Sequence, residues 1–250
     1  GCCEFLSETY YHSLSFLYSR DEFRQQVEQH DKLIEDLFGQ TPTIFRNTEL
    51  IYNNEVGHYI SSLGKYKAVI CEGADHLLGY RSPNYLYTPP GSPGCKLLLK
   101  NYRLRDDIAF RFSNRGWAEW PLTAEKFADW VNQVNGNGYA VNLFMDYETF
   151  GEHQWTETGI FDFLYHMPGE VMKISRDNDF KKPSEIVGAY EPTGEYDCPH
   201  LISWADTERD LSAWLGNAMQ SSALQEAFAL EGAVKAKGDA ELLSDWRRLL

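Results

Sequence analysis

Acidic side chains gather in the short segment MDYETFGEH, at residues 145–153. The apolar run YAVNLFM comes just before it and predicts a buried strand over 139–145. Asp146, Glu148 and His153 are therefore expected where that strand ends. A plain surface loop is the alternative, but a polar cluster directly after a buried strand favours a functional site, and its carboxyl groups are suited to acid–base chemistry.

A second acidic candidate lies in the segment FRNTELIYNNE, at residues 45–55. Glu49 follows a predicted strand over 43–45 and is flanked by the apolar residues 50–52. A carboxylate among apolar neighbours costs desolvation free energy unless it has a partner or a chemical role. Arg46 is the obvious partner, so a buried Arg–Glu pair is the alternative to a catalytic role for Glu49.

A third segment, GCCEFLSETYYH at residues 1–12, places Glu4 inside a predicted strand over 1–6. His12 lies further along and is interpreted as a structural or loop histidine. In β/α barrels the functional residues lie where strands end and loops begin. The three segments therefore become candidates for one site if their strands belong to the same barrel.

The elements that must position these residues alternate between short apolar runs and helical periodicity. Strands are predicted at 1–6, 43–45, 67–71, 95–99, 108–112 and 139–145, and helices at 21–38, 54–63, 123–134 and in the tail from 207 onward. This alternation predicts an α/β fold of parallel strands joined by helices. A closed or nearly closed β/α barrel fits the length, and an open doubly wound sheet is the alternative, although no GxGxxG follows a strand.

Composition narrows the classes of partner. The net charge of −14 disfavours binding to nucleic acid or to an anionic membrane surface. No apolar run approaches the roughly 20 residues that span a bilayer, and the start does not have the pattern of a signal peptide. The five cysteines are scattered, without a CxxC pair, which indicates reduced thiols in a cytoplasmic protein.

Four segments, taken in order, resemble the motif regions of glycoside hydrolase family 57, in particular its α-amylase-like branch. The resemblance rests on GCCEFLSETYYHSL, FRNTELIYNN, MDYETFGEHQW and WADTERDLSAWLGNAMQ, which are similar to the second, third, fourth and fifth regions of the family. It implies an incomplete seven-stranded β/α barrel followed by C-terminal helices. It also implies action on α-glucans, such as starch, glycogen or maltooligosaccharides, with retention of configuration.

The resemblance assigns roles to individual residues. Glu49 falls on the nucleophile of the third region and Asp146 on the acid/base of the fourth. Glu4 falls on a substrate-binding carboxylate of the second region. Trp204 and Asp206 fall in the fifth region, which borders the sugar subsites.

Three further residues of the fourth region are expected to contact substrate. These are Glu148, His153 and Trp155, of which Trp155 is equally well explained by packing. Glu148 is also the alternative to Asp146 as the acid. In the implied mechanism the two catalytic carboxyl groups lie about 5–5.5 Å apart, and the acid is protonated before the first step.

The resemblance also sets expectations for the domains. Residues 1–205 are expected to form the catalytic β/α barrel portion, and residues 206–250 a helical segment packed on it. The family's first region, a His-Gln-Pro segment, is absent. The chain is therefore expected to be an internal fragment, truncated at the N-terminus of the barrel.

Several functional alternatives remain open at this point. Hydrolysis and 4-α-glucanotransferase activity share one covalent intermediate, and a catalytically inert α-glucan-binding homologue is a third possibility. A zinc-dependent deacetylase or mannosidase would recruit Asp146, His153 and His76, but no HxxxH or paired-Asp spacing supports it. No cofactor and no metal are expected, the partner is an α-glucan, and the sequence gives no oligomeric state.

Overall fold

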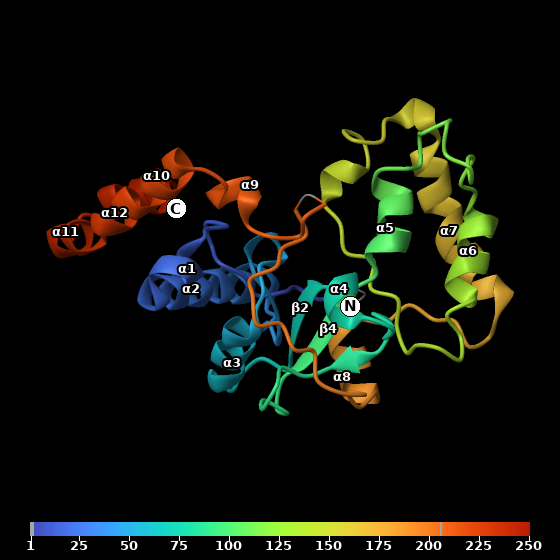
Figure 1. Ribbon diagram of the computed structural model, residues 1–250, viewed down its shortest axis with the longest axis horizontal. Helices are drawn as coiled ribbons and strands as arrows, with labels where there is room; N and C mark the ends of the chain where they lie inside the picture. The colour runs from blue at the N-terminus through green and yellow to red at the C-terminus, as the bar shows by residue number, and fades with distance from the viewer. Residues whose placement is uncertain (1–2, 206) are drawn as a thin grey trace. The chain divides into compact units, whose positions relative to one another are not determined.

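The computed structural model describes residues 3–205 and 207–250, in which short strands alternate with helices in an α/β fold (Figure 1). The strands are β1 (Ile44–Arg46), β2 (Ala68–Glu72), β3 (Leu86–Tyr87) and β4 (Lys96–Lys100), hydrogen-bonded in the order β1-β2-β4-β3. The helices are α1 (Ser15–Tyr18), α2 (Arg20–Phe38), α3 (Asn54–Ser62), α4 (Asp75–Leu78), α5 (Tyr102–Ala109), α6 (Ala124–Asn132), α7 (Ile160–Ile174), α8 (Pro183–Ala189), α9 (Ser212–Leu215), α10 (Ala218–Ala229), α11 (Glu231–Lys237) and α12 (Ala240–Arg247). Short 3₁₀ helices are η1 (Thr48–Leu50), η2 (Tyr147–Thr149) and η3 (Thr156–Thr158).

The chain divides into two compact units. Unit 1 comprises Gly1–Glu72, Thr88–Leu97 and Glu195–Leu250, and unit 2 comprises Gly73–Tyr87 and Leu98–Gly194. The C-terminal helices thus belong to the same unit as the first part of the chain. The predicted division into residues 1–205 and 206–250 stays a prediction.

Helix α2 shows how the sequence sets the boundaries of an element in unit 1. The Ser19 side chain accepts a hydrogen bond from the Glu22 N–H at the N-terminus, and Gly39, at φ 63°, ends the helix in the left-handed conformation. Phe23 and Val27, four residues apart, are buried on one face of the helix. The predicted helix over 21–38 is confirmed, and so are the predicted helices at 54–63 and 123–134 and the helical tail.

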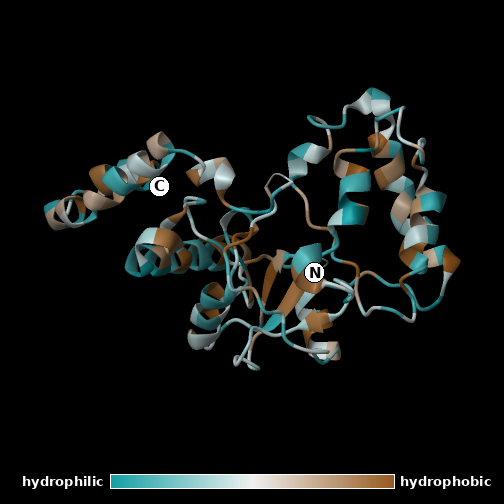
Figure 2. Cartoon of the chain, in the orientation of Figure 1, coloured by the Kyte–Doolittle hydropathy of each residue, from teal (hydrophilic) through white to brown (hydrophobic). Residues whose placement is uncertain are grey.

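Strand β1 of unit 1 ends shortly before Glu49. Strand β1 is parallel to β2, with Ile44 opposite Ala68. Ser7 lies on the other side of β1, in an isolated parallel bridge with Phe45. The residues of β1 and β2 are buried, and Figure 2 shows β2 and β4 in the brown of hydrophobic residues. Glu49 comes three residues after β1 ends.

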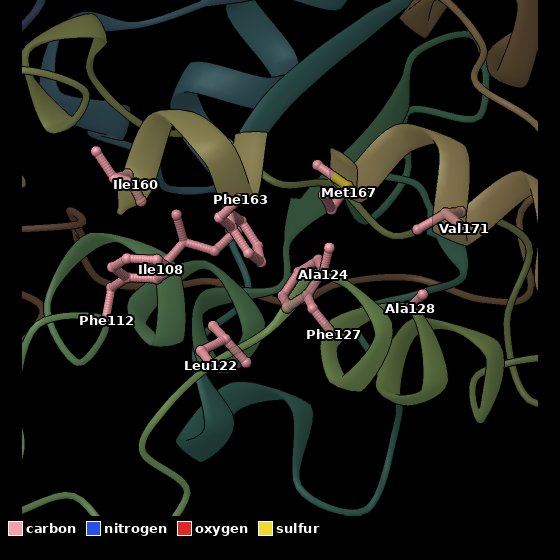
Figure 3. Close-up of a cluster of buried hydrophobic side chains, with 10 residues drawn as sticks. All are labelled: Ile108, Phe112, Leu122, Ala124, Phe127, Ala128, Ile160, Phe163, Met167 and Val171. Carbon is pink, nitrogen blue, oxygen red and sulfur yellow. The ribbon is translucent and has the colours of Figure 1, made fainter. Parts of the chain in front are cut away.

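The core of unit 2 lies between helices α6 and α7. Ile108, Phe112, Leu122, Ala124, Phe127, Ala128, Ile160, Phe163, Met167 and Val171 form it (Figure 3). The Phe163 ring meets the Phe127 ring edge-on, with 5.6 Å between their centroids. Leu143 and Met145, from the segment that leads to Asp146, pack against the same cluster. This core therefore supports the loop that carries the acidic cluster.

Two predicted strands in unit 2 are wrong. Residues 108–112 lie at the end of α5 and in the turn after it, because Ile108 and Phe112 have the i,i+4 spacing that directs both to the helical core. The segment 139–145 contains no named strand, and Asn142 forms a single parallel bridge with Lys100 at the end of β4. Its apolar side chains pack on helices, so an apolar run did not require a full strand there.

The predicted strand over 1–6 is also not observed in its described part, residues 3–6. Its pairing is reduced to the bridge at Ser7. Helix α7, with Pro168 inside it, was not predicted, since apolar residues surround it on more than one face. The cysteines that the structure describes, Cys3, Cys71, Cys95 and Cys198, are free thiols.

The C-terminal helices are joined to α2 by buried charge. Glu22 is fully buried, and Arg247 of α12 donates to it from Nε at 2.6 Å. Lys235 of α11 lies 2.9 Å from the other oxygen of the same carboxylate. Removal of either cation would leave a buried carboxylate with fewer partners, which is costly. In the part of the chain that the structure describes, no helix is both long and apolar enough to cross a bilayer.

The packing of α7 gives a direct test of the unit 2 core. We expect Phe163→Ala to lower the free energy of unfolding by about 3–5 kcal/mol, because it removes a buried ring from a filled core. Tyr165→Ala, on the same helix but with Tyr165 81% exposed, is the matched control and should change it little. Urea unfolding followed by tryptophan fluorescence measures both, and equal losses would contradict this account of the core.

Candidate active site

Glu49 has a backbone conformation that residues with a side chain rarely adopt. Its φ is 54° and its ψ 26°, and Leu50 also has a positive φ of 52°. Such left-handed geometry costs a non-glycine residue on the order of 1–3 kcal/mol and persists only where surrounding contacts hold it. Strain of this kind is concentrated at functional sites, so the backbone itself marks Glu49 as a candidate.

The backbone of Glu49 is held by a loop from the far end of the chain. Its C=O accepts hydrogen bonds from the Trp204 N–H at 3.2 Å and from Ser203 Oγ at 2.9 Å. Ser203 is fully buried. The two bonds fix the peptide group that follows the strained residue, and thereby fix the direction in which the carboxylate projects.

Each oxygen of the Glu49 carboxylate has a donor. His12 Nε2 lies 2.9 Å from Oε1, and the Trp204 indole N–H donates to Oε2 at 2.7 Å. The side chain remains 27% exposed. The hydrogen bond from His12 holds the pKa of Glu49 below its usual value; burial opposes this shift, and the bond from Trp204 and the charges of His12 and Arg46 reinforce it. Glu49 is therefore an ionised carboxylate at neutral pH.

A second layer orients His12. Arg46 Nη1 lies 3.4 Å from His12 Nδ1 and donates to Glu8 Oε2 at 2.7 Å. His12 thus presents one ring nitrogen to Glu49 and the other to Arg46. Arg46 thus pairs with Glu8, and the direct Arg46–Glu49 pair considered from the sequence is not the arrangement found.

Hydroxyl groups anchor the segment that carries His12. Thr48 Oγ1 donates to the Ser13 C=O at 2.8 Å and lies 2.9 Å from Thr9 Oγ1. All three of these residues are buried. The network ties residues 9–13 to the residue before Glu49. His12, interpreted from the sequence as a structural or loop histidine, contacts Glu49 and is the site candidate that the sequence analysis missed. The rule that active residues follow strands could have found it, since it comes shortly after the bridge at Ser7.

A cavity of about 360 Å³ opens beside Glu49. His12 and Glu49 line it together with Trp214, Gln220 and Leu250 from the C-terminal part of unit 1. Its lining combines an ionised carboxylate, an imidazole, an aromatic ring and an amide with apolar side chains. This is the composition of a small-molecule site, in which a few polar groups orient a ligand against apolar walls.

Asp146 lies in unit 2 at the start of η2. It is the N-cap residue, its C=O accepts from the Thr149 N–H at 3.1 Å, and its side chain is half-buried. Glu148 and His153 are exposed, and Trp155 is 60% exposed. Packing therefore does not account for most of the Trp155 surface, so the core-packing alternative loses support.

Hydrogen bonds from side chains to backbone hold the loop of the acidic cluster at both ends. The Gln154 side chain is buried and donates from Nε2 to the Ala109 C=O at 2.9 Å. Upstream, Asn142 Nδ2 donates to the Leu99 C=O at 2.9 Å. Asp146 thus follows a segment bound to the end of β4, as Glu49 follows β1. Both carboxylates come shortly after backbone that pairs in the parallel sense.

The other predicted site residues divide into two groups. Trp204 contacts Glu49 directly. Glu4 lies between Cys3 and Phe5, whose backbone groups form hydrogen bonds with the Gln40 side chain. Gln40 precedes β1, whereas Glu49 follows it. Glu8 of this segment pairs with Arg46 at the site, and the substrate-binding role of Glu4 stays a prediction. Asp206 lies outside the described residues.

The structure also bears on a metal-dependent alternative. Among residues 3–205 and 207–250, no group of three or more His, Cys, Asp or Glu side chains is arranged to hold a metal ion. The set Asp146, His153 and His76 is thus not gathered as metal ligands. The geometry instead presents an ionised carboxylate beside a cavity.

Comparison with known proteins decides the family. The family model described as Glycosyl hydrolase family 57 matches residues 1–199. The chain belongs to this family. A curated protein of Methanocaldococcus jannaschii with the name "Putative alpha-amylase" is 51% identical over 223 residues, which are 88% of this chain and 46% of that protein. The chain therefore spans about half the length of this relative.

Two solved structures share the fold. A 4-alpha-glucanotransferase from Thermococcus litoralis superposes with a TM-score of 0.64 and 16% identity, covering 99% of this chain and 36% of its own. A family 57 branching enzyme from Thermococcus kodakaraensis gives a TM-score of 0.62 and 16% identity, covering 91% and 54%. At this identity the likeness establishes the fold alone. The family 57 resemblance inferred from the four motifs is confirmed.

The strained backbone of Glu49 predicts an unusual order of stability. Glu49→Gly and Glu49→Ala remove the same hydrogen bonds, but glycine adopts a φ of 54° without the steric cost. We expect the glycine variant to be more stable by about 1 kcal/mol. Urea unfolding of the two variants measures the difference, and a more stable alanine variant would show that the left-handed geometry is not strained.

The donors around Glu49 predict a pH effect of defined sign. Because the folded pKa is lowered, ionised Glu49 stabilises the protein above its unfolded pKa, and this contribution is lost as pH falls through the folded value. Removing the main donor in His12→Ala should raise the pKa of Glu49. Carboxyl ¹³C NMR of the wild type and the variant measures this shift, and an unchanged pKa would exclude His12 as its main cause.

Proposed function

We propose that this protein is a retaining glycosidase that acts on α-glucans, with Glu49 as nucleophile and Asp146 as acid/base. The observation that carries the proposal is Glu49 itself, which is ionised, held by a donor on each oxygen and placed beside a cavity. A nucleophilic carboxylate must be ionised before it attacks. The α-amylase name of the curated relative supports α-glucan as the substrate class.

The proposed chemistry is a double displacement. A Glu49 oxygen attacks the anomeric carbon while Asp146 donates a proton to the departing glycosidic oxygen, and the bond between that oxygen and the anomeric carbon breaks. The product of this step is a glycosyl ester on Glu49. Asp146 then removes a proton from water, the water oxygen attacks the anomeric carbon, and the ester bond breaks. Two inversions at one carbon give net retention.

The local geometry fits the nucleophile's part in this sequence. Trp204 and His12 donate to the carboxylate in its charged form, which keeps it ionised and fixes its direction. These bonds weaken when the charge is lost in the ester. They are regained when the ester is cleaved, so the donors favour release of Glu49 in the second step.

The proposal includes the fold that brings the two residues together. Glu49 follows β1, and Asp146 follows the segment bridged to the end of β4. In β/α barrels such positions face the active site. We therefore propose an incomplete seven-stranded β/α barrel with the C-terminal helices packed on it; a retaining mechanism requires two catalytic carboxyl groups about 5–5.5 Å apart.

Substrate contacts are proposed for the exposed groups near each catalytic residue. Glu148 and His153 offer hydrogen bonds to sugar hydroxyls, and the exposed face of Trp155 suits stacking on a sugar ring. Trp204 is proposed to border the sugar at the nucleophile. Asp206 keeps its proposed role from the fifth motif. No cofactor takes part in this scheme, and the free thiols are consistent with a cytoplasmic setting.

Azide rescue tests both catalytic roles at once. We expect Glu49→Gly to lose at least about 10⁴-fold in kcat on an α-maltosyl fluoride. Azide should restore turnover and give the β-glycosyl azide, because it attacks in place of the missing carboxylate. Asp146→Ala should retain attack on the fluoride, whose leaving group needs no proton, and should give the α-glycosyl azide. Product anomers are assigned by ¹H NMR.

Matched variants separate the alternatives. Glu148→Gln removes the other candidate acid of the cluster. If the α-glycosyl azide forms with this variant and not with Asp146→Ala, the acid/base residue is Glu148. Products from maltooligosaccharides distinguish hydrolysis from glucan transfer, since transfer yields longer chains. Binding of maltooligosaccharide by a wild-type protein without turnover would indicate an inert binding homologue and would overturn the enzyme proposal.

A further inference from the structure

A buried ion pair lies behind the loop that holds Glu49. Glu72, the last residue of β2, is fully buried, and Arg209 Nη1 donates to its Oε2 at 2.5 Å. The Arg209 side chain is only 16% exposed. Arg209 also has a left-handed backbone, with φ 57°. Arg209 thus combines a strained backbone with a charged side chain that reaches the fully buried Glu72 carboxylate.

Arg209 is connected to Glu49 through two residues. The Arg209 C=O accepts the Ser203 N–H at 3.2 Å, which closes the loop at its base. Ser203 Oγ donates to the Glu49 C=O, and Trp204 donates to the same carbonyl and to the carboxylate. Each link in this path is a hydrogen bond within unit 1.

The loop is held on its other side as well. Tyr52 and Ile202 form an antiparallel bridge, with reciprocal N–H···O=C bonds of 3.0 and 2.9 Å. Ser203 and Trp204 therefore lie between two anchors, the Tyr52 bridge and the Arg209 ion pair. The bridge fixes the backbone just before Ser203 and Trp204. The ion pair fixes Arg209, whose C=O accepts the hydrogen bond from the Ser203 N–H.

Stability alone does not explain such a pair. A buried ion pair is costly to desolvate, and apolar residues of similar volume often give equal or greater stability. A buried ion pair can instead favour one arrangement of the backbone that carries it, because its two charged groups stabilise each other only at short range. The pair thus selects one conformation of the loop that carries Trp204.

We propose that the Glu72–Arg209 ion pair is a positioning device that holds the Trp204 indole N–H on the nucleophilic carboxylate of Glu49. The proposal deepens the proposed function and rests on it, since it assigns to Glu49 the role of nucleophile. Arg209 and Glu72 act through Trp204 and are positioning residues. The device joins the end of β2 to the residue that follows β1.

A pH readout follows from the groups that face Glu49. Among residues 3–205 and 207–250, the charged or titratable groups recorded around its carboxylate are His12 and Arg46, with Glu8 beyond them. Loosening the loop removes the Trp204 donor and leaves the other groups in place. The pKa of Glu49 should then rise towards its usual value, because one of the bonds that lower it is lost.

The experiment compares Arg209→Ala and Glu72→Gln with the conservative variant Arg209→Lys. We expect kcat on maltooligosaccharides to fall by about 10- to 100-fold in the first two, as for a displaced supporting residue, with a smaller change in KM. The acidic limb of the kcat/KM profile should move to higher pH. Arg209→Lys keeps the charge and should recover part of both effects.

A second measurement does not depend on activity. In ¹⁵N-labelled protein, the indole N–H signal of Trp204, assigned with Trp204→Phe, should follow the titration of Glu49 in the wild type. In Arg209→Ala it should shift and lose that pH dependence. If the wild type shows the titration but no glycosidase activity, the proposed function fails while the positioning role stands.

The control is Arg24→Ala, which removes an exposed arginine that pairs with Asp21 and Glu28 on α2. It should leave the acidic limb and the Trp204 signal unchanged. Folded Arg209→Ala protein with a wild-type acidic limb and a wild-type Trp204 signal would overturn the proposal. If Arg209→Ala does not fold, the same two readouts on Arg209→Lys and Glu72→Gln decide it.

Discussion

The hydrogen bond between the Trp204 indole and the Glu49 carboxylate is the contact on which the organisation of the proposed nucleophile depends. Glu49 sits in a left-handed conformation that its own sequence does not favour. Contacts from elsewhere in the chain must therefore hold it. Three hydrogen bonds do so, from the Trp204 backbone N–H, the Trp204 indole and the Ser203 hydroxyl group. The strained residue and these contacts form one unit, because the contacts set the direction of the carboxylate, while the hydrogen bond from His12 is the main cause of its lowered pKa.

Buried charge is used repeatedly to bring distant parts of unit 1 together. Glu22 holds Arg247 and Lys235, which joins the C-terminal helices to α2. Glu72 holds Arg209, which closes the loop next to Glu49. Both acids are fully buried, so each requires its cations in place. The C-terminal part of the chain, which also lines the cavity at Glu49, is thus fixed by specific partners and not by apolar packing alone.

Local sequence signals predicted some elements of this fold and mispredicted others. The helix over 20–38 was predictable because its cap, its apolar spacing and its terminal glycine agree. The apolar runs at 108–112 and 139–145 were predicted as strands, but their side chains fill a core made by helices. An apolar run indicates that its residues are buried, but it does not indicate whether strands or helices bury them. The motifs did not single out Glu8 and His12, which reach the site because Ser7 pairs with β1.

The sequence by itself determined the family, through four motifs in order, and named Glu49, Asp146 and Trp204 as residues of interest. It did so because motif identity and helical spacing are local properties of the chain. Only the tertiary structure decided which groups surround Glu49. His12 is 37 residues away along the chain and Trp204 is 155 away. Contacts over such separations, and the lowered pKa that follows from them, exist only once the strands and the C-terminal segment have packed together.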